Sequence, residues 1–221
     1  MIYTIYGRPK VGKTTLALKD APKGKTAILS ADRGLIGIET EGFEIIEDTS
    51  IKNINKQVLS KAFLQKHKRI VIDTGTALYQ DMLLEISGGG APSLQHRGLA
   101  NNAFATLMRA MRGPEVEAIV TCQERMILPT EDWSSDDDDE DITASVTADL
   151  PEGPRGILTQ MSDMIGRMYI ANVDGKSARR LWLAPTPNIV AGTRSKVYKG
   201  RPPYLKQPSI SRLNELLGWT S

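Results

Sequence analysis

The sequence predicts an α/β fold in which helices cover both faces of a mainly parallel, twisted sheet. Short apolar segments alternate with longer amphipathic segments along most of the 221 residues, which is the pattern of repeated strand–helix units. A glycine-rich turn joins the first such strand to the first helix. The length suits one domain with a substantial core, so we predict a single domain over residues 1–221.

The individual elements follow from hydrophobic periodicity. The expected strands are residues 1–6, 26–30, 43–46, 69–72, 118–122, 168–171 and 180–183. The expected helices are residues 13–19, 51–66, 77–86, 101–111, 156–165 and 211–217. Residues 197–221 are expected to form a C-terminal tail that ends in the last of these helices.

Two stretches interrupt the alternation and are predicted to be long loops. They are residues 87–98, which read SGGGAPSLQHRG, and residues 124–155. Loops of this length in a compact domain are usually functional or mobile.

The net charge of +2 conceals an uneven distribution. Residues 131–141 contain eight acidic residues and no basic one, and the rest of the chain has 28 Lys and Arg against 18 Asp and Glu. After Pro151 there are eleven basic and four acidic residues. This balance is compatible with a polyanionic partner but does not establish one.

Several classes of protein are disfavoured by composition. The single cysteine, Cys122, excludes an internal disulfide, and with only His67 and His96 beside it there is no zinc-binding cluster. No segment approaches the roughly 18 apolar residues of a membrane span. The chain enters a strand at its first residues without a signal-peptide pattern, so we expect a cytoplasmic protein without a membrane partner.

The turn after the first strand matches the P-loop motif G-x-x-x-x-G-K-[ST] at every fixed position. The glycines allow the backbone to curl around phosphates, and the following helix directs its N-terminus at the same anion. Lys13 is expected to reach the β- and γ-phosphates of ATP, and the Thr14 hydroxyl to bind Mg²⁺. A chance glycine-rich turn is the alternative, but the flanking strand and helix argue against it. The expected nucleotide-binding residues are Gly7, Arg8, Pro9, Lys10, Val11, Gly12, Lys13, Thr14 and Thr15.

Residues 69–73 (RIVID) form a buried-type strand that ends in a carboxylate, as in a Walker B motif. Parallel strands carry their functional groups at their carboxyl ends, so Asp73 and the P-loop should share one edge of the sheet. We therefore predict that Asp73 and Thr14 are the magnesium-binding residues. The alternative is that Asp73 only caps the next helix.

Two further strands end in polar side chains. Asp32 follows residues 26–30 and could position the attacking water during hydrolysis, or it could be a turn aspartate before Gly34. Gln123 ends another strand and could sense the γ-phosphate, or it could be a polar residue that leaves the core. Cys122 is interpreted as core filling, because no histidine neighbours it in the sequence.

This order of motifs resembles the RecA-like ATPase core. The P-loop is followed by an acid after the second strand (SADRGL), the Walker B aspartate (IVIDT) and a strand that ends in glutamine (VTCQ). In particular, the chain looks like the short RecA relatives of bacteriophages described as single-strand annealing or recombination ATPases. The resemblance covers residues 1–199 and implies a host-cell cytoplasmic location if the chain is phage-encoded.

The resemblance also implies residue roles. Asp32 stands where the family has its catalytic carboxylate, usually a longer glutamate, and Gln123 stands where the γ-phosphate is coupled to DNA binding. Residues 87–98 and 124–155 occupy the places of the two DNA-binding loops. Arg194, with Lys196 as a second candidate, falls where relatives present basic fingers to the ATP of an adjacent subunit; a solvated basic turn is the alternative. The implied partners are single-stranded DNA, a single-strand binding protein and further copies of the chain, in a ring or filament with ATP at subunit interfaces.

The acidic run departs from this pattern, because acids repel a phosphate backbone. It could be a solvated tether, a DNA mimic, or a sign that the substrate is not DNA. Basic residues could still meet DNA, and Tyr198 and Tyr204 could stack on bases or could pack against the body. The basic residues are Arg97, Arg125, Arg155, Lys196, Lys199, Arg201 and Lys206.

Three functions are compatible with these motifs. The favoured one is a DNA-stimulated, magnesium-dependent ATPase that acts on single-stranded DNA in recombination, annealing or replication. The second is a DNA-annealing or loading module that uses ATP to assemble with little turnover. The third is a small-molecule kinase, which would need an arginine-rich lid that the long acidic loop does not provide.

Overall fold

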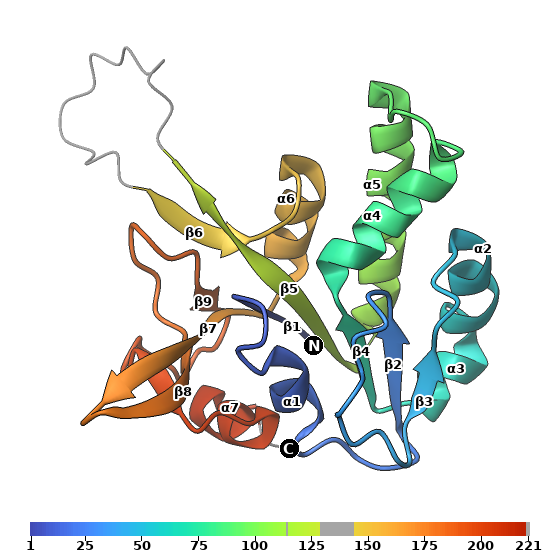
Figure 1. Cartoon of the computed structure of the whole chain (residues 1–221). Coiled ribbons are helices and arrows are strands. Elements are labelled where there is room, and N and C mark those ends of the chain that lie inside the picture. The colour runs from blue at the N-terminus through green and yellow to red at the C-terminus, as the bar shows by residue number, and fades with distance from the viewer. Residues whose placement is uncertain (114, 129–143, 220–221) are drawn as a thin grey trace.

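The computed structural model of the chain describes residues 1–113, 115–128 and 144–219 (Figure 1). The strands are β1 (Ile2–Gly7), β2 (Thr26–Ser30), β3 (Glu44–Ile46), β4 (Arg69–Asp73), β5 (Glu117–Ile127), β6 (Ser145–Ala148), β7 (Met164–Val173), β8 (Lys176–Trp182), β9 (Gly192–Thr193) and β10 (Tyr204–Lys206). The helices are α1 (Lys13–Leu18), α2 (Ile51–Asn53), the π-helical turn η1 (Ile54–Val58), α3 (Lys61–Lys66), α4 (Gly75–Ile86), α5 (Leu94–Met111), α6 (Glu152–Met161) and α7 (Ile210–Leu217).

A mainly parallel sheet runs through the molecule in the order β10-β8-β7-β1-β5-β4-β2-β3. The pairs from β3 to β7 are all parallel, whereas β8 and β10 continue the sheet in antiparallel fashion. Strand β1 lies in the middle, between β5 and β7, and its last residue, Gly7, is opposite Gln123 of β5. The predicted α/β fold with a mainly parallel sheet is therefore confirmed.

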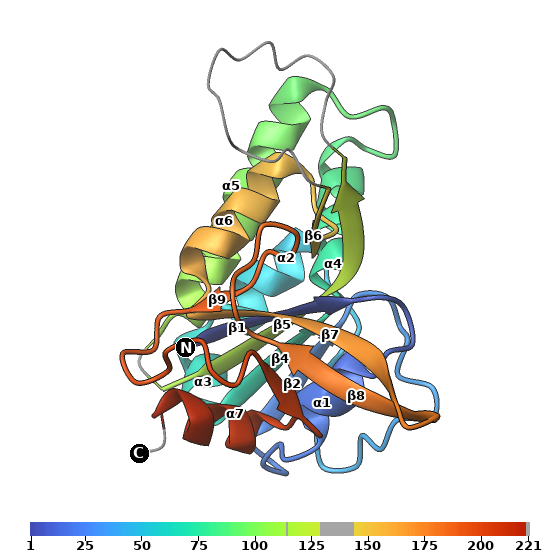
Figure 2. The same ribbon diagram turned by 90° about the vertical axis from the view of Figure 1, so that its left-hand side faces the viewer.

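Helices cover both faces of this sheet, as predicted (Figure 2). One core contains Leu78 and Met82 of α4, Phe104 of α5 and Leu158 of α6, packed against side chains such as Ile72 of the sheet. The other core joins α1 and α7 to the opposite face. The central strands are buried from both sides, which explains why β1 and β4 appear in the sequence as continuous apolar runs rather than alternating ones.

The prediction of a loop at residues 87–98 is partly wrong. Helix α5 begins at Leu94, seven residues before the expected start, and only residues 87–93 connect it to α4. Ser93 caps the helix by accepting the His96 backbone N–H, while the His96 ring accepts the Ser93 N–H. A capping box normally has Glu or Gln in the place of His96, and Gly98 lies inside the helix, so local signals pointed away from helix here.

The prediction of a loop over residues 124–155 is also partly wrong. Strand β5 continues to Ile127 and pairs with β6 in an antiparallel arm that extends past the end of β1 (Figure 1). Helix α6 then begins at Glu152. Glu124 and Arg125 are polar because the arm lies outside the core, so their sequence resembles that of a loop. Their partners in β6 are about 20 residues further along the chain, so no short hairpin turn marks the pairing. The acidic run lies outside the described residues.

Two expected helices are shorter or broken. The helix expected at residues 156–165 ends at Met161, because Ser162 is extended and the chain passes directly into β7 at Met164. The helix expected at residues 51–66 is divided at Ser60, whose side chain caps α3 by accepting the Phe63 N–H.

The tail also contains a strand that was not predicted. Strand β10 pairs with β8, and its Tyr204 ring stacks on Trp182 with centroids 6.2 Å apart. Tyr198 is buried, and its hydroxyl donates to the Pro202 carbonyl at 2.6 Å. The tail is thus docked on the body, so of the two alternatives for its tyrosines the packed one holds.

Candidate functional site

The P-loop connects β1 to α1 in a conformation that requires its glycines. A Cβ atom on Gly7 would lie 2.3 Å from the Met168 carbonyl oxygen of the neighbouring strand β7. Gly12 has φ 99°, a left-handed conformation that other residues rarely adopt, and Lys10 is also left-handed with φ 62°. The two motif glycines are therefore needed for a close approach and for a left-handed bend, respectively.

Lys13 folds back over this loop. Its side chain is buried, and its ammonium group donates to the carbonyl oxygens of Gly7 and Arg8 at 2.9 Å each. Gln123 Oε1 lies 3.4 Å from the same nitrogen. Burial lowers the pKa of Lys13, although Asp73 opposes this effect. The ammonium is thus desolvated and held by neutral acceptors that phosphate oxygens can replace.

Asp73 lies at the carboxyl end of β4, next to the start of α1. Its carboxylate is buried and accepts Thr14 Oγ1 at 3.0 and 3.2 Å and Thr121 Oγ1 at 2.5 Å. Burial raises the pKa of Asp73, and the Thr121 hydrogen bond opposes this rise. The pairing of one hydroxyl with one carboxylate provides the hard oxygen ligands that Mg²⁺ prefers. The predicted magnesium pair, Thr14 and Asp73, therefore fits the ion.

Gln123 is brought to the same place by the pairing of β5 with β1. Its backbone N–H donates to Thr76 Oγ1 at 3.2 Å, which ties the strand to the start of α4. The neighbouring Cys122 is fully buried, and burial raises its thiol pKa to about 12, in keeping with a core role.

Asp32 lies on the same edge of the sheet, but its carboxylate is engaged in a turn. Its Oδ1 accepts the Gly34 N–H at 2.9 Å, and the side chain is exposed. The charge of Asp32 is still close enough to contribute to the raised pKa of Asp73 and to oppose the lowering of the Lys13 pKa by burial. The residue thus combines features of both alternatives, a position on the rim of the site and a turn aspartate.

Arg194 lies at the opposite end of the strands from the P-loop, near the first residue of β1. Its backbone N–H donates to the Asp163 carbonyl at 2.8 Å, and the Asp163 carboxylate accepts the N–H of Ile2, the first residue of β1. The guanidinium group donates to the Gln160 carbonyl. Arg194 is therefore one strand length away from the P-loop of its own chain.

Comparison with known protein families shows the family to which the chain belongs. A family model described as AAA domain matches residues 1–195. The chain belongs to this AAA family. It is thus a P-loop ATPase of the AAA type, whose nucleotide would be held by the residues described above. No protein of curated function matches the chain.

The described helices of this AAA domain include none that is long and apolar enough to cross a membrane. The described residues also contain no group of three or more His, Cys, Asp or Glu side chains that could hold a metal ion.

Sequence reasoning missed two polar groups of the AAA site. Thr121 contacts Asp73, and it could have been found from the alternation of β5, where residues 121 and 123 point to the same side. Glu124 accepts two hydrogen bonds from Arg167, at 2.7 and 3.1 Å, and lies 3.5 Å from Arg8 of the P-loop. No local signal marks Glu124, because its partners come from the P-loop and β7.

Proposed function

We propose that the chain is a RecA-like ATPase that acts on single-stranded DNA, in phage recombination, annealing or replication. The observation that carries the proposal is the position of Gln123. It lies 3.4 Å from the ammonium of Lys13, at the point where β5 leaves the sheet and enters the β5–β6 arm. A phosphate that draws Lys13 away from its present acceptors would change the contact at Gln123, and with it the arm.

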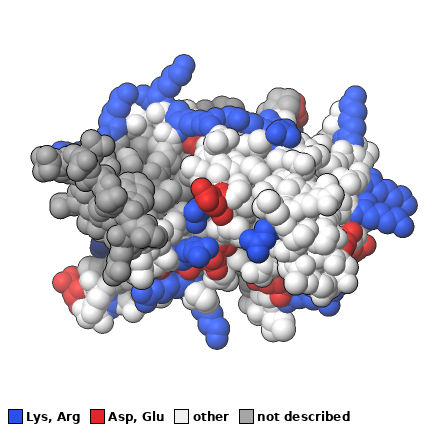
Figure 3. Space-filling model, turned by 90° about the horizontal axis from the view of Figure 1, so that it is seen from above, with Lys and Arg blue, Asp and Glu red and all other residues white. Residues whose placement is uncertain are grey.

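The arm offers basic groups for a polyanion. Arg125 of β5 and Arg155 of α6 line one hollow of about 490 Å³, together with the exposed Met126 and Leu128 and with one acid, Glu152. Figure 3 looks down on this side of the molecule and shows more Lys and Arg than Asp and Glu side chains on the visible surface. Cationic side chains beside apolar ones suit a single strand, whose phosphates and base faces are both accessible.

Within the site, the residues of this chain would bind and orient the nucleotide. Lys13 exchanges the carbonyls of Gly7 and Arg8 for phosphate oxygens, while Thr14 and Asp73 hold Mg²⁺. The ion, when bound, neutralises phosphate charge that develops during transfer. Gln123 provides an amide on the γ-phosphate side.

The test is the rate of phosphate release from ATP with no nucleic acid, single-stranded DNA, double-stranded DNA or RNA. We expect single-stranded DNA to raise the rate most, and Lys13→Ala to abolish the rate in every case. DNA affinity should fall steeply with salt, because contacts to phosphates release counterions. Equal rates in all four conditions would contradict a nucleic-acid partner, and a phosphorylated small molecule would instead indicate a kinase.

A second candidate function is favoured by Asp32. The Gly34 N–H holds Oδ1 of the Asp32 carboxylate in a turn, so only Oδ2 has no hydrogen-bond partner among the described residues and could position a water molecule. A DNA-annealing or loading module that binds ATP to assemble, with little turnover, would have this property. Annealing that persists in Lys13→Ala without ATP binding would favour neither candidate, whereas annealing that needs ATP binding but not hydrolysis would favour the module.

We further propose that the chain assembles head to tail, as a ring or filament with ATP between subunits. Arg194 lies at the amino edge of the sheet and the P-loop at the carboxyl edge, so a head-to-tail contact would bring the arginine of one subunit to the ATP of the next. A single-strand binding protein is a further partner that the resemblance implies.

Arg194→Ala should keep its nucleotide affinity and lose turnover, by at least about tenfold. Lys199→Ala, at an exposed cation nearby, is the matched control. Mixing Arg194→Ala with Lys13→Ala subunits should restore part of the turnover, because each subunit supplies what the other lacks. Full activity of Arg194→Ala in a demonstrably monomeric sample would contradict action between subunits.

A further inference from the structure

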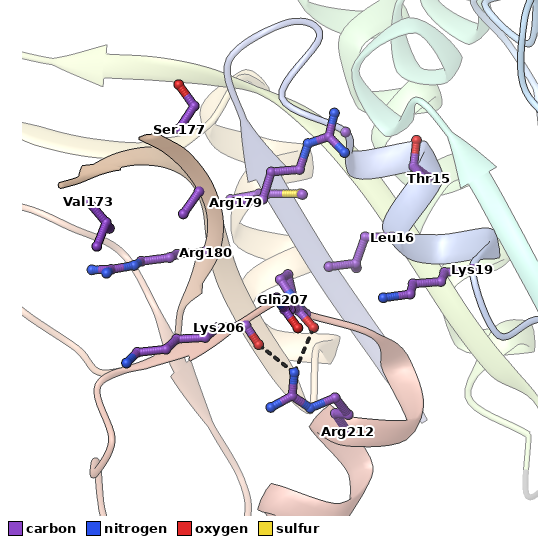
Figure 4. A pocket seen from close by; sticks show the side chains of 14 residues that line it. Thr15, Leu16, Lys19, Val173, Ser177, Arg179, Arg180, Lys206, Gln207 and Arg212 are labelled. Atoms are coloured by element: carbon purple, nitrogen blue, oxygen red, sulfur yellow. Dashed lines mark hydrogen bonds between the residues drawn. The ribbon is translucent and has the colours of Figure 1, made fainter. Parts of the chain in front are cut away.

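A large cavity lies beside the P-loop, between α1 and the β7–β8 hairpin (Figure 4). Its volume is about 710 Å³, within the range of sites that bind small molecules and cofactors. It is bounded by α1, by the β7–β8 hairpin and by the segment that leads from β10 into α7. Gly12 and Thr15 line it, whereas Lys13 and Thr14 do not. The cavity therefore begins where the site for the terminal phosphates ends.

The lining of this cavity is basic. Five cationic side chains contribute to it and no acidic one does: Lys19, Arg179, Arg180, Lys206 and Arg212. Two of them have partners within the chain. Arg212 donates to the carbonyl oxygens of Lys206 and Gln207 at 2.7 and 3.0 Å, and the Arg180 guanidinium lies 4.4 Å from the centre of the Tyr204 ring.

Arg179 differs from these two. Successive residues of β8 point to opposite sides, and Figure 4 shows Arg179 directed towards the P-loop and α1 while Arg180 points away. A Cβ atom on Gly12 would lie 3.1 Å from Arg179 Nε and 3.3 Å from its Cζ, so the guanidinium group lies directly against the phosphate-binding loop. Among the described residues, Arg179 forms no ion pair and no side-chain hydrogen bond.

We propose that Arg179, which lies outside the P-loop motif, is a further nucleotide-binding residue and that it binds the α- and β-phosphates of ATP at the mouth of this cavity. The inference rests on nucleotide binding at the P-loop, as proposed above. Lys13, Thr14 and Asp73 hold the terminal phosphates and the ion at one end of the P-loop. Arg179, with its donors free and Gly12 beneath it, meets the α- and β-phosphates where the chain of phosphates enters the cavity. A guanidinium group offers several donors in a planar fork that matches phosphate geometry.

The assignment explains a second feature of Gly12. Its left-handed φ of 99° already favours glycine, and the Arg179 guanidinium occupies the space that a side chain at this position would need. The P-loop and β8 are thus fitted to each other across the mouth of the cavity.

The experiment measures the affinity of the full chain for ATP, ADP and adenosine, by competition with a fluorescent ATP analogue in magnesium buffer. The variants are Arg179→Ala, Arg179→Lys and the matched control Lys176→Ala, which removes an exposed cation of the same strand that does not line the cavity. Thermal unfolding of each variant establishes that it is folded.

We expect Arg179→Ala to weaken ATP and ADP binding equally, by about tenfold or about 1.4 kcal/mol, and to leave adenosine binding unchanged. Arg179→Lys should recover part of the loss, and Lys176→Ala should bind like the wild type. Wild-type affinity in Arg179→Ala would overturn the inference, and so would tighter binding, which would mean that the arginine blocks the site. A loss for ATP alone would place Arg179 on the γ-phosphate instead. Absence of nucleotide binding in the wild type would overturn the proposed function as well, so the two failures are distinguishable.

Discussion

The two sides of the P-loop helix are built differently. On the side of β4 and β5, every polar group already has a partner within the chain: Lys13 is held by two carbonyl oxygens, and Asp73 by two hydroxyl groups. On the side of β8, the cavity is open and basic, and Arg179 has no polar side-chain partner among the described residues. Bound phosphate must therefore displace existing hydrogen bonds on the first side, whereas on the second side it meets free donors.

The two sides should therefore contribute differently to nucleotide binding: the first fixes the geometry of the ligand, and the second attracts its charge. Buried groups whose partners are already in place are held in position and lose little freedom when ligand arrives. Exposed cations add affinity over a longer range but define geometry poorly, because their side chains are mobile and screened. We therefore expect substitutions on the Asp73 side to change turnover and ion binding, and substitutions on the Arg179 side to change nucleotide affinity.

The largest expected effect on the Asp73 side comes from Asp73→Asn. Loss of the carboxylate should lower the rate of ATP hydrolysis by about a thousandfold, since a bound metal ion contributes several kcal/mol and each 1.36 kcal/mol is tenfold in rate. The free energy of unfolding, in contrast, should be higher in Asp73→Asn than in the wild type. Burial raises the folded-state pKa of Asp73, so above that pKa the ionised carboxylate costs folding free energy that a neutral amide does not.

The measurements are phosphate release and chemical denaturation at neutral pH, with nucleotide affinity as the control. An Asp73→Asn protein that is less stable than the wild type would show that the carboxylate is structural. In that case the ionised carboxylate of Asp73 would stabilise the fold, and the site would carry no cost in stability.

The position in the fold of the residues on this side of the site could be predicted from the sequence, because each of them has a local requirement. Gly12 needs a left-handed backbone, Gly7 needs the absence of a side chain, and Lys13 follows both at fixed spacing. Asp73 could be placed because a carboxylate after a buried strand must emerge at the carboxyl edge of a parallel sheet.

The other side could not be predicted, because it depends on pairing between distant segments. Arg179 reaches the P-loop only because β8 pairs with β7 and β7 with β1. The β5–β6 arm and β10 were missed for the same reason, since their partners lie far away in the chain. The early start of α5 was missed for a local reason, namely that His96 replaces the usual acid of a capping box.

A smaller effect on the Asp73 side is expected from Thr121→Val, which keeps the shape of the side chain and removes its hydroxyl. Thr121 Oγ1 donates to Asp73 Oδ1 at 2.5 Å and orients this carboxylate from β5. Hydrogen-bond partners of metal ligands typically contribute about tenfold or more to metal affinity. The magnesium concentration for half-maximal hydrolysis should therefore rise about tenfold, while ATP affinity measured without magnesium stays the same.

The matched control for Thr121→Val is Thr4→Val. Thr4 is also a buried threonine on a central strand, but its hydroxyl bonds to Ser162 at 2.7 Å, away from the nucleotide. Both variants lose one buried hydrogen bond and should lose similar stability, about 1 kcal/mol. Only Thr121→Val should alter the magnesium requirement. If both variants shifted it equally, general loosening of the sheet would be the cause, and the distinction between an ordered Asp73 side and an open Arg179 side would not hold.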